Sequence, residues 1–357
     1  MMTNLEHIDA MRAIDCDDML SHIDALADQF ENAWNHAQAL PLPNDYGDVR
    51  QIVVCGMGGS AIGGDLTAAL VSATSPVPFT VLRGYDLPAY VSGPETLVIA
   101  SSNSGNTEET LAAAHQAIER GAKLLAVTTG GTLTAHATAH GYPLWQFSYQ
   151  SPPRAALGWS FGLLIGLAAR LQLAPNLEAD LQEALAVMRQ YQPLYAIDTP
   201  VAQNPAKRGA GQLIGRIPVV HGSGIFEPVA RRWKGQFNEN AKTWAQFEAM
   251  PEANHNAVTG IINPEDRIPN MAALFIDSPE FDHPRVSLRY TFTGQIYLQN
   301  GIKVDTFHPQ GNSALAQMCH AIQYGDYTSF YLALAYEADP TEIAPIIELK
   351  TRLADEG

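Results

Sequence analysis

Cysteine and basic side chains are scarce in this sequence of 357 residues. The three cysteines, Cys16, Cys55 and Cys319, have a spacing that matches neither a zinc site nor a CxxC redox pair. Their odd number fits a reducing compartment best, so we expect a cytoplasmic protein. Lys and Arg together number 21, against 37 Asp and Glu, which gives a formal charge of -16. Such an acidic chain repels nucleic acid and anionic lipid, so neither is an expected partner.

Long hydrophobic runs are also missing. No apolar stretch approaches ~18 uncharged residues, the length that a membrane-spanning helix needs. The first residues, MMTNLEHIDAMRAID, lack the basic start and the apolar run of a signal peptide. Hydrophobic residues still make up 46% of the chain, which is enough for a sizeable core. The length suits about two domains.

Apolar strands alternate with helical segments through the first half of the chain. The expected strands are residues 51–56, 79–84, 96–101 and 123–129. The expected helices are residues 60–74 and 107–121. This alternation is typical of a parallel sheet with helices on both faces. An apolar helix that follows a Pro-Pro pair, within residues 151–173, is expected to close this domain.

The second half repeats the order of strand, glycine-rich turn and helix in RIPVVHGSGIFEPVARRWKGQFNENAK, residues 216–242. A helical stretch at roughly 176–194 leads into it. Strands at 271–277 and 302–311 and a helix at 314–337 follow. The two halves therefore predict a duplicated α/β unit. Only the first half contains a polar loop like 101–110, so one such site per chain is expected.

Helices are also predicted at both ends of the chain. Apolar residues recur at helical spacing over 16–36, namely Met19, Ile23, Leu26, Phe30 and Trp34. The apolar surface of this amphipathic helix is compatible with a contact between subunits. The last residues predict a further helix, which Pro345 interrupts.

A glycine-rich turn, CGMGGSAIGGD at 55–65, follows the first strand and opens a helix. Glycines allow a close backbone approach to a ligand, and a helix N-terminus offers free N–H groups to an anion. One reading is a dinucleotide fold, but that needs an acidic residue at the end of the next strand, where Arg83 stands. The spacing of Gly56, Gly58 and Gly63 also departs from GxGxxG. A tight turn with no ligand is the other alternative.

The stretch SSNSGNTEET, residues 101–110, places many hydroxyl and carboxamide groups directly after a buried strand. Ser102, Ser104 and Thr107 lie between that strand and the start of a helix. This arrangement gathers hydroxyls and backbone N–H groups around one point, which suits a phosphate monoester. Thr107 can also be read as an ordinary helix cap, but one cap needs one such residue rather than several. The stretch has no lysine, so it is not a Walker loop.

These motifs resemble the sugar isomerase (SIS) domain. The resemblance rests on GMGGSAIGGD at 56–65 and SSNSGNTEETL at 101–111. Further motifs narrow it to the bifunctional phosphoglucose/phosphomannose isomerases: PPRAALG at 152–158, FNENAK at 237–242, PEANHN at 251–256 and IIELK at 346–350. The similarity runs from about residue 35 to about residue 355. One departure is Asn103, where the family often has an aromatic residue.

The resemblance implies two SIS-type domains, each a parallel sheet flanked by helices, with a C-terminal helix reaching back over the cleft between them. The predicted parts are an N-terminal helical extension at 1–40, a first SIS domain with the phosphate loop at 41–175, a second SIS domain at 176–340 and the C-terminal helix at 341–357. Enzymes of this family interconvert glucose 6-phosphate or mannose 6-phosphate with fructose 6-phosphate through a cis-enediol, without metal or nucleotide. No cofactor is therefore expected. A histidine comes from a neighbouring subunit in the family, so a homodimer with shared sites is expected.

Two sets of residues carry over from this resemblance. The substrate phosphate is expected at the glycine turn and the hydroxyl-rich loop, on Gly58, Gly59, Ser60, Ser102, Ser104 and Thr107. The chemistry is expected from Glu239 as the base, His255 and Lys350 for ring opening, and Arg154 facing the enediolate.

Each of these catalytic roles has an ordinary alternative. Moving a proton between C1 and C2 needs one carboxylate near both carbons, yet a glutamate such as Glu239 most often lies on a helix surface. His255 lies in a polar, turn-like stretch, which is unlike the surroundings of a core histidine. Arg154 and Lys350 can also be read as solvent-exposed side chains. The remaining histidines considered are expected to be structural: His136, His140, His221, His308 and His320.

Three other functions stay open at this point. A non-catalytic sugar-phosphate sensor would keep the polar loop and need neither Glu239, His255 nor Lys350. Such sensors usually carry a DNA-binding part, and the N-terminal ~40 residues are too acidic and too short for one. The second alternative is an SIS isomerase acting on another sugar phosphate. The third is the dinucleotide oxidoreductase that Arg83 argues against.

Overall fold

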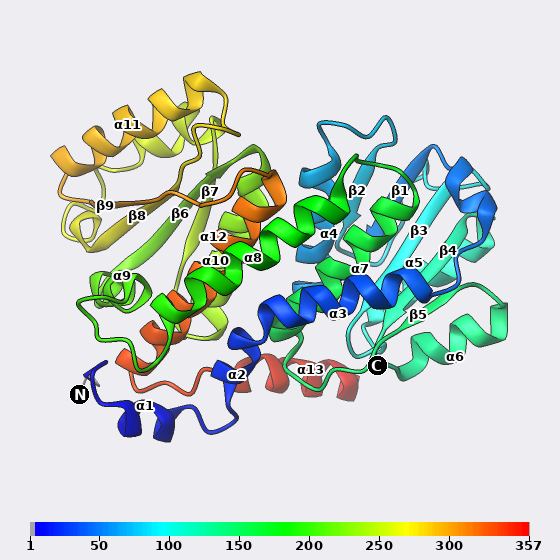
Figure 1. Ribbon diagram of the computed structural model, residues 1–357, viewed down its shortest axis with the longest axis horizontal. Helices are drawn as coiled ribbons and strands as arrows, with labels where there is room; N and C mark the ends of the chain where they lie inside the picture. Colours follow the sequence, from blue (N-terminus) through cyan, green and yellow to red (C-terminus); the bar gives the residue numbers. More distant parts are fainter. Residues whose placement is uncertain (1–3, 357) are drawn as a thin grey trace. The chain divides into compact units, whose positions relative to one another are not determined.

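The computed structural model describes residues 4–356 and falls into two compact units (Figure 1). The first unit comprises residues 24–189 and 310–319, and the second comprises the described residues of 1–23, 190–309 and 320–357. Residues 1–3, which begin the predicted extension, lie outside the described part. Residue 357, which ends the predicted terminal helix, also lies outside it.

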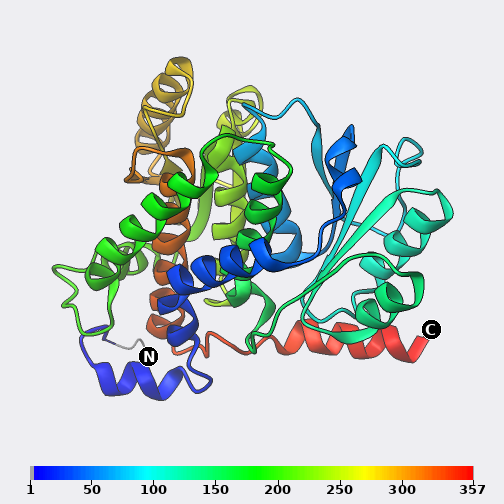
Figure 2. The same ribbon diagram turned by 45° about the vertical axis from the view of Figure 1, so that its right-hand side comes forward.

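The first unit is built on a five-stranded parallel sheet with the order β2-β1-β3-β4-β5 (Figure 2). Its strands are β1 (Gln51–Cys55), β2 (Phe79–Leu82), β3 (Thr96–Ser102), β4 (Lys123–Thr128) and β5 (Leu144–Gln146). The helices between them are α4 (Gly58–Val71), α5 (Glu108–Glu119) and α6 (Gly131–His140). Every residue of β3 is buried, as expected for a central parallel strand covered on both faces. The predicted parallel α/β architecture is confirmed.

Two helices of the first unit, α3 (Leu26–Ala39) and α7 (Leu157–Arg170), pack closely together. Glycines recur every four residues along α7 on the face toward α3. A Cβ atom at Gly162 would lie 2.8 Å from Ala33 Cβ, and one at Gly166 would lie 2.4 Å from Ala37 Cβ. Only a residue without a side chain lets the two backbones approach this closely.

The single helix predicted over 16–36 is wrong in two respects. The segment forms two helices, α2 (Met19–Asp24) and α3, which are separated at Ala25. Its apolar residues, including Phe30 and Trp34, are buried within the chain. The buried residues of α3 therefore do not offer an apolar surface to another subunit, because α3 packs against α7.

The second unit has a four-stranded parallel sheet with the order β7-β6-β8-β9. Its strands are β6 (Ile217–Ser223), β7 (Gln246–Met250), β8 (Met271–Ile276) and β9 (Lys303–Phe307). The helices that lie wholly in this unit are α1 (Ile8–Ile14), α9 (Pro205–Leu213), α10 (Glu227–Glu239), α11 (Pro284–Gln299) and α13 (Ala344–Glu356). Boundaries between the units lie within α2 and within the two long helices α8 (Leu177–Tyr195) and α12 (Ala314–Ala335), and a further one follows residue 309.

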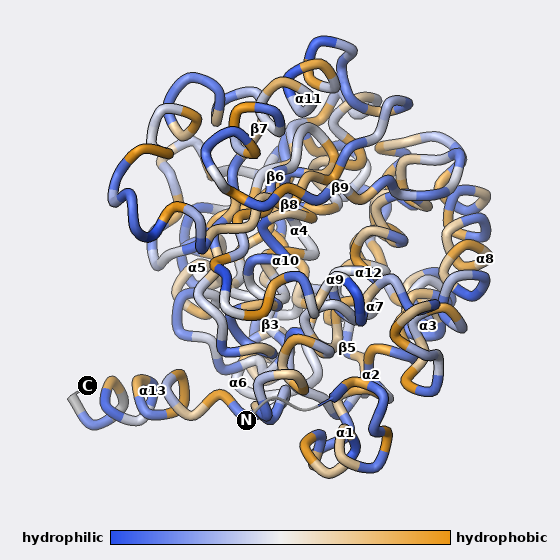
Figure 3. Tube along the Cα trace, turned by 90° about the vertical axis from the view of Figure 1, so that its left-hand side faces the viewer, coloured by the Kyte–Doolittle hydropathy of each residue, from blue (hydrophilic) through white to orange (hydrophobic). Residues whose placement is uncertain are grey.

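The C-terminal helix differs from its prediction at one point. Pro345 lies in the first turn of α13, where its missing N–H removes no helical hydrogen bond, so it does not interrupt the helix. Figure 3 shows hydrophobic and hydrophilic segments alternating along α13, and Ile347, Leu349 and Leu353 are exposed on it. No helix within residues 4–356 is both long enough and apolar enough to cross a bilayer.

Two buried histidines are structural, as predicted. The ring of His221 contacts Val219 O at 3.1 Å through Nδ1 and the Tyr297 hydroxyl at 3.3 Å through Nε2. The ring of His320 contacts the Tyr195 hydroxyl at 2.9 Å. Burial lowers the pKa of each histidine to about 4, so both rings are neutral near pH 7.

Candidate active site

The two polar loops of the first unit follow neighbouring strands. The chain leaves β1 toward β2 on one side and returns to β3 on the other, with Cys55 of β1 paired to Ala100 of β3. This is the topological switch point of the sheet, where open α/β folds bind ligands outside the carboxyl ends of their strands. The glycine turn after β1 and the loop 101–107 after β3 therefore lie at the same place.

The glycine turn lies directly against the end of β3. A Cβ atom at Gly56 would be 2.7 Å from Ser101 O and 3.2 Å from Ser60 Cβ, so only glycine fits there. Gly58 has a φ of 50°, in the left-handed region, and begins α4. Ser60 follows in the first turn of α4 and is buried. This turn places the N-terminus of a helix beside the loop that follows β3.

The side-chain hydroxyls of the loop 101–107 form hydrogen bonds within the loop. Ser102 Oγ and Thr107 Oγ1 are 2.8 Å apart, and Gly105 N–H donates to Ser102 Oγ at 3.1 Å. Asn106 N–H donates to Ser104 Oγ at 3.2 Å. Thr107 stands at the N-cap position of α5, but its side chain makes no capping hydrogen bond. The reading of Thr107 as an ordinary side-chain cap is therefore wrong.

A second glycine-rich turn, between β4 and α6, supports this loop. Thr129 Oγ1 donates to Asn103 O at 2.7 Å, and Leu133 N–H donates to Gly105 O at 2.9 Å. Gly105 has a φ of 69°, and a Cβ atom on it would lie 1.8 Å from Gly130 O. Sequence reasoning missed this support, although TTGGT at 128–132 repeats the pattern of a strand followed by a glycine turn. Asn103 contributes its backbone carbonyl here, which any residue type supplies.

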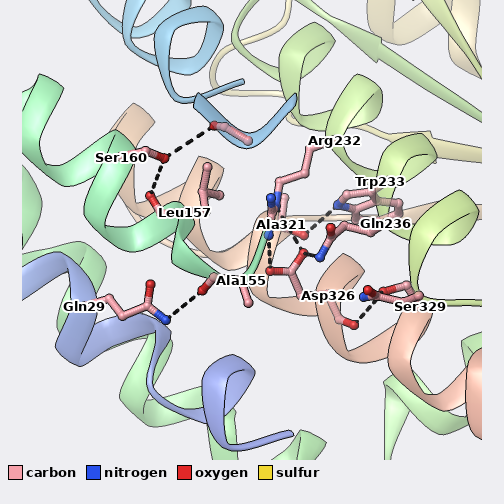
Figure 4. A network of polar contacts seen from close by, with 12 residues as sticks. Gln29, Ala155, Leu157, Ser160, Arg232, Trp233, Gln236, Ala321, Asp326 and Ser329 are labelled. Carbon is pink, nitrogen blue, oxygen red and sulfur yellow. Dashed lines mark hydrogen bonds and ion pairs between the residues drawn. The ribbon is translucent and has the colours of Figure 1, made fainter. Parts of the chain in front are cut away.

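Arg154 lies beside the glycine turn in the first unit. It follows Pro153 in a short 3-10 helix, Pro153–Ala156, and only 4% of it is exposed. A Cβ atom at Gly59 would lie 2.9 Å from Pro153 O and 3.5 Å from Arg154 Cα. The alternative of a solvent-exposed arginine is therefore wrong. The buried Gln29 of α3 fixes the adjacent backbone, because its Nε2 donates to Ala155 O at 3.0 Å (Figure 4).

The glycine turn and the loop 101–107 together form a polar corner at this end of the sheet, and its electrostatics favour a small anion. The helices α4 and α5 both begin there, and helix N-termini carry partial positive charge. Ser104 and Gly58 are exposed, so the corner is open to solvent. Arg83 donates to Asp65 Oδ1 at 3.2 Å, so the residue after β2 is held by α4. The first unit thus gathers all six predicted phosphate residues and the predicted Arg154 at the same end of its sheet.

The second unit does not bring the predicted catalytic residues Glu239 and His255 together. Glu239 is the last residue of α10 and is partly buried. Because α10 leads back from the end of β6 to the start of β7, Glu239 lies near the edge where the strands begin. His255 follows the end of β7 and is exposed. The five residues of β7 span about 16 Å, so the two side chains lie at opposite edges of the sheet.

The surroundings of His255 leave its ring facing solvent while they hold the backbone. Asn254 Nδ2 donates to Thr293 Oγ1 at 2.8 Å, and Asn256 Nδ2 donates to Glu252 Oε1 at 3.0 Å. The neighbouring asparagines therefore fix the turn, and the imidazole is presented outward. Lys350 is likewise exposed, on α13.

Family models match both halves of the chain. The model of the SIS domain matches residues 46–141. The model described as the bacterial phospho-glucose isomerase C-terminal SIS domain matches residues 202–353. These matches agree with the duplicated α/β architecture.

Relatives match almost the whole length. A bifunctional phosphoglucose/phosphomannose isomerase from Caldicellulosiruptor bescii is 37% identical over 338 residues, which cover 94% of this chain and 99% of that one. A protein of the same name from Aquifex aeolicus is 33% identical, over 90% of this chain and 96% of that one.

Solved structures share the fold. The C-terminal domain of glucosamine-fructose-6-phosphate aminotransferase from Francisella tularensis matches with a TM-score of 0.74 at 13% identity, over 91% of this chain and 98% of that one. A glucose-6-phosphate isomerase like protein from Thermus thermophilus matches with a TM-score of 0.63 at 19% identity, over 96% and 99%. At these identities the likeness shows the fold alone.

Proposed function

The chain belongs to the family of bifunctional phosphoglucose/phosphomannose isomerases, and from this we infer that it is an aldose–ketose isomerase. Its reaction interconverts glucose 6-phosphate and fructose 6-phosphate through a cis-enediol. The names of these relatives include phosphomannose isomerase, so we propose mannose 6-phosphate as a further substrate. This inference rests on the sequence identity to these relatives over nearly the full length of the chain, together with the polar corner at the β1/β3 switch point.

We propose that this corner binds the substrate phosphate. Ser102, Ser104 and Thr107 offer hydroxyls, and Gly58, Gly59 and Ser60 form the first turn of α4. A phosphate monoester has three strong acceptor oxygens and about two negative charges, which match hydroxyl donors and helix N-termini. Because the chain carries a charge of -16, these local donors have to outweigh the electrostatic repulsion between the protein as a whole and the anionic substrate.

We propose that Glu239 is the base that moves the proton between C1 and C2. The reaction needs one proton acceptor within reach of both carbons, and a partly buried carboxylate meets this need. The enediolate that forms carries negative charge on oxygen. Arg154 is buried beside the polar corner, and its positively charged guanidinium would stabilise that charge.

We propose that His255 and Lys350 open the sugar ring, with His255 acting in the site of a neighbouring subunit of a homodimer. The support is topological. His255 and Glu239 lie at opposite edges of the same sheet, so His255 of one chain is poorly placed to serve Glu239 of that chain. An exposed imidazole on a fixed turn is suited to reach a different chain.

The test of this function is a coupled assay for glucose 6-phosphate formed from fructose 6-phosphate, with no cofactor added to the isomerase. We expect steady formation of glucose 6-phosphate. A protein that binds fructose 6-phosphate without converting it would be a sugar-phosphate sensor instead. Conversion of other sugar phosphates only would indicate an SIS isomerase of different specificity.

A further inference from the structure

The middle of α10 is tied to α12 by a buried ion pair. Arg232 donates from Nε to Asp326 Oδ1 at 3.1 Å and from Nη2 to Asp326 Oδ2 at 2.6 Å. Both side chains are only 4% exposed. Figure 4 shows the guanidinium of Arg232 and the carboxylate of Asp326 facing each other in the interior of the second unit.

Further buried side chains extend this network along the last turns of α10. Gln236 Nε2 donates to Asp326 Oδ1 at 3.0 Å, and Asn240 Nδ2 donates to Ser329 Oγ at 3.0 Å (Figure 4). The hydroxyl of Ser329 in turn donates to Asp326 O at 2.8 Å. Gln236, Asn240, Asp326 and Ser329 are all nearly inaccessible to solvent.

Stability alone is a weak reason for this arrangement. Taking two charges out of water is expensive, and apolar residues of similar volume often stabilise a protein as well as a buried ion pair does. Burial raises the pKa of Asp326, although Arg232 and Gln236 act in the opposite direction. What the polar network adds is geometry, because directional hydrogen bonds define one arrangement of the two helices where apolar contacts tolerate several.

The residue held by this geometry is Glu239, the last residue of α10. Helix ends fray, because their final carbonyl groups lack partners within the helix. Here Gln236, one turn before Glu239, and Asn240, directly after it, are both bound to α12. Lys242 Nζ also donates to Glu239 O at 2.9 Å. The backbone of Glu239 is therefore fixed on both sides.

We propose that Asp326 is a positioning residue for the isomerase reaction, which acts through Gln236 and Arg232 to hold the Glu239 carboxylate in the place where it takes the substrate proton. The proposal rests on the proposed function, in which Glu239 is the base. It assigns to α12 a role in catalysis through the contacts of the buried Asp326 with α10.

The test compares kinetics with stability in a charge-free variant, Arg232→Met with Asp326→Leu. Removing both charges together leaves no unpaired ion in the core, so the protein is expected to fold with a melting temperature within about 5 °C of the natural chain. If Asp326 positions Glu239, kcat falls about 10–100-fold, since displacement of a catalytic group by ~1 Å has effects of that size. The KM for fructose 6-phosphate changes less than about threefold, because the phosphate is bound by residues of the first unit. Exchange of the C1 proton in D₂O falls with kcat.

Gln236→Met is the second variant, and it decides the matter if the charge-free variant does not fold. It keeps the length of the side chain and breaks only the link to Asp326. Its kcat should also fall, with KM unchanged. Tyr331→Phe is the matched control, because it removes a buried hydrogen bond from α12 to Tyr195 O, away from α10. We expect it to lower the melting temperature and to leave kcat unchanged.

A folded charge-free or Gln236→Met variant with the natural kcat would overturn the positioning role. Glu239→Gln is measured in parallel, so that the two failures can be told apart. Natural activity in Glu239→Gln would overturn the proposed base itself. Loss of activity in Glu239→Gln with full activity in both network variants would overturn only the role of Asp326.

Discussion

Ser102 and Thr107 are joined by a hydrogen bond of 2.8 Å between their side-chain oxygens, which links the last residue of β3 to the start of α5. The bond runs across the loop and leaves Ser104 exposed at its tip. One side-chain hydroxyl thereby orients another, so the loop is preorganised before any ligand arrives. A preorganised cradle loses little conformational entropy on binding, which favours affinity for a small anion.

The first prediction concerns the phosphate cradle. Replacing Ser104 and Thr107 together by Ala removes two hydroxyls, and hydrogen bonds to a charged group are worth about 1.5–3 kcal/mol each. The KM for fructose 6-phosphate should therefore rise at least about tenfold in steady-state kinetics. Thr138→Ala is the control, because its hydroxyl donates only to Thr134 O on the exposed side of α6. An unchanged KM in the double variant would remove the loop from the phosphate site.

The second prediction concerns the glycine that closes the loop. Gly105→Ala should destabilise the protein and weaken sugar-phosphate binding, because the new Cβ would lie 1.8 Å from Gly130 O. Gly121→Ala is a matched control with nearly the same backbone, a φ of 67° against 69°, and with open space around its Cβ. It should cost only the left-handed strain of about 1–2 kcal/mol and leave KM unchanged. Equal effects of both variants on KM would mean that the contact with Gly130 does not matter.

The third prediction concerns stability and pH. Burial lowers the pKa of His221 to about 4, whereas the unfolded chain has a value of about 6.5. Between these values the unfolded state binds a proton that the folded state excludes. The stabilisation due to the neutral ring is therefore fully present above about pH 6.5 and is lost as the pH falls through about 4, up to about 3 kcal/mol in all.

His221→Gln is the variant that isolates this effect. Its free energy of unfolding in urea should depend less on pH than that of the natural chain between about pH 6.5 and about pH 4. His320 is unchanged in both proteins and so cancels in the comparison. If the free energies of unfolding of the two proteins changed equally with pH, His221 would not titrate in the way its burial implies.

The fourth prediction concerns the shared site. Glu239→Gln and His255→Ala chains should each have low activity alone, although His255→Ala retains some on substrate that is already open-chain. If His255 acts in the neighbouring subunit, dissociating and reassociating an equal mixture restores a natural site in each mixed dimer. Random pairing then gives about a quarter of natural activity. A mixture no more active than the average of its components would place both residues in one chain's site, or exclude a dimer.

Sequence reasoning located the fold well because central parallel strands are continuous apolar runs. β1, β3 and β4 are such runs, and their predicted ranges agree with the structure within two residues. Two of the four edge strands, β5 and β7, were not predicted, because they are short and polar residues such as Gln146 and Glu248 interrupt their apolar pattern. The break at Ala25 was missed because it does not disturb the helical spacing of the apolar residues around it.

The features of the candidate site can likewise be divided into those that the sequence predicted and those that it did not. The hydroxyls of the loop 101–107 form a local pattern, so the sequence alone was enough to predict a phosphate site there. The turn at 128–132 that supports them lies beside them only through the pairing of β3 with β4. Asp326 gave no signal, since its partner Arg232 is 94 residues away in sequence. Glu239, His255 and Lys350 have no local pattern at all, and only the family resemblance indicated their roles.

The most direct test of the account is proton exchange catalysed by Glu239→Gln. This variant keeps the size of the side chain and cannot take a proton. Proton NMR of fructose 6-phosphate in D₂O follows loss of the C1 proton with the natural chain and with the variant. The account predicts that the variant still binds fructose 6-phosphate while exchange and isomerisation both fall by at least ~10²–10⁴, the contribution of a general base. Exchange at the natural rate in Glu239→Gln would contradict the assignment of the base and the mechanism built on it.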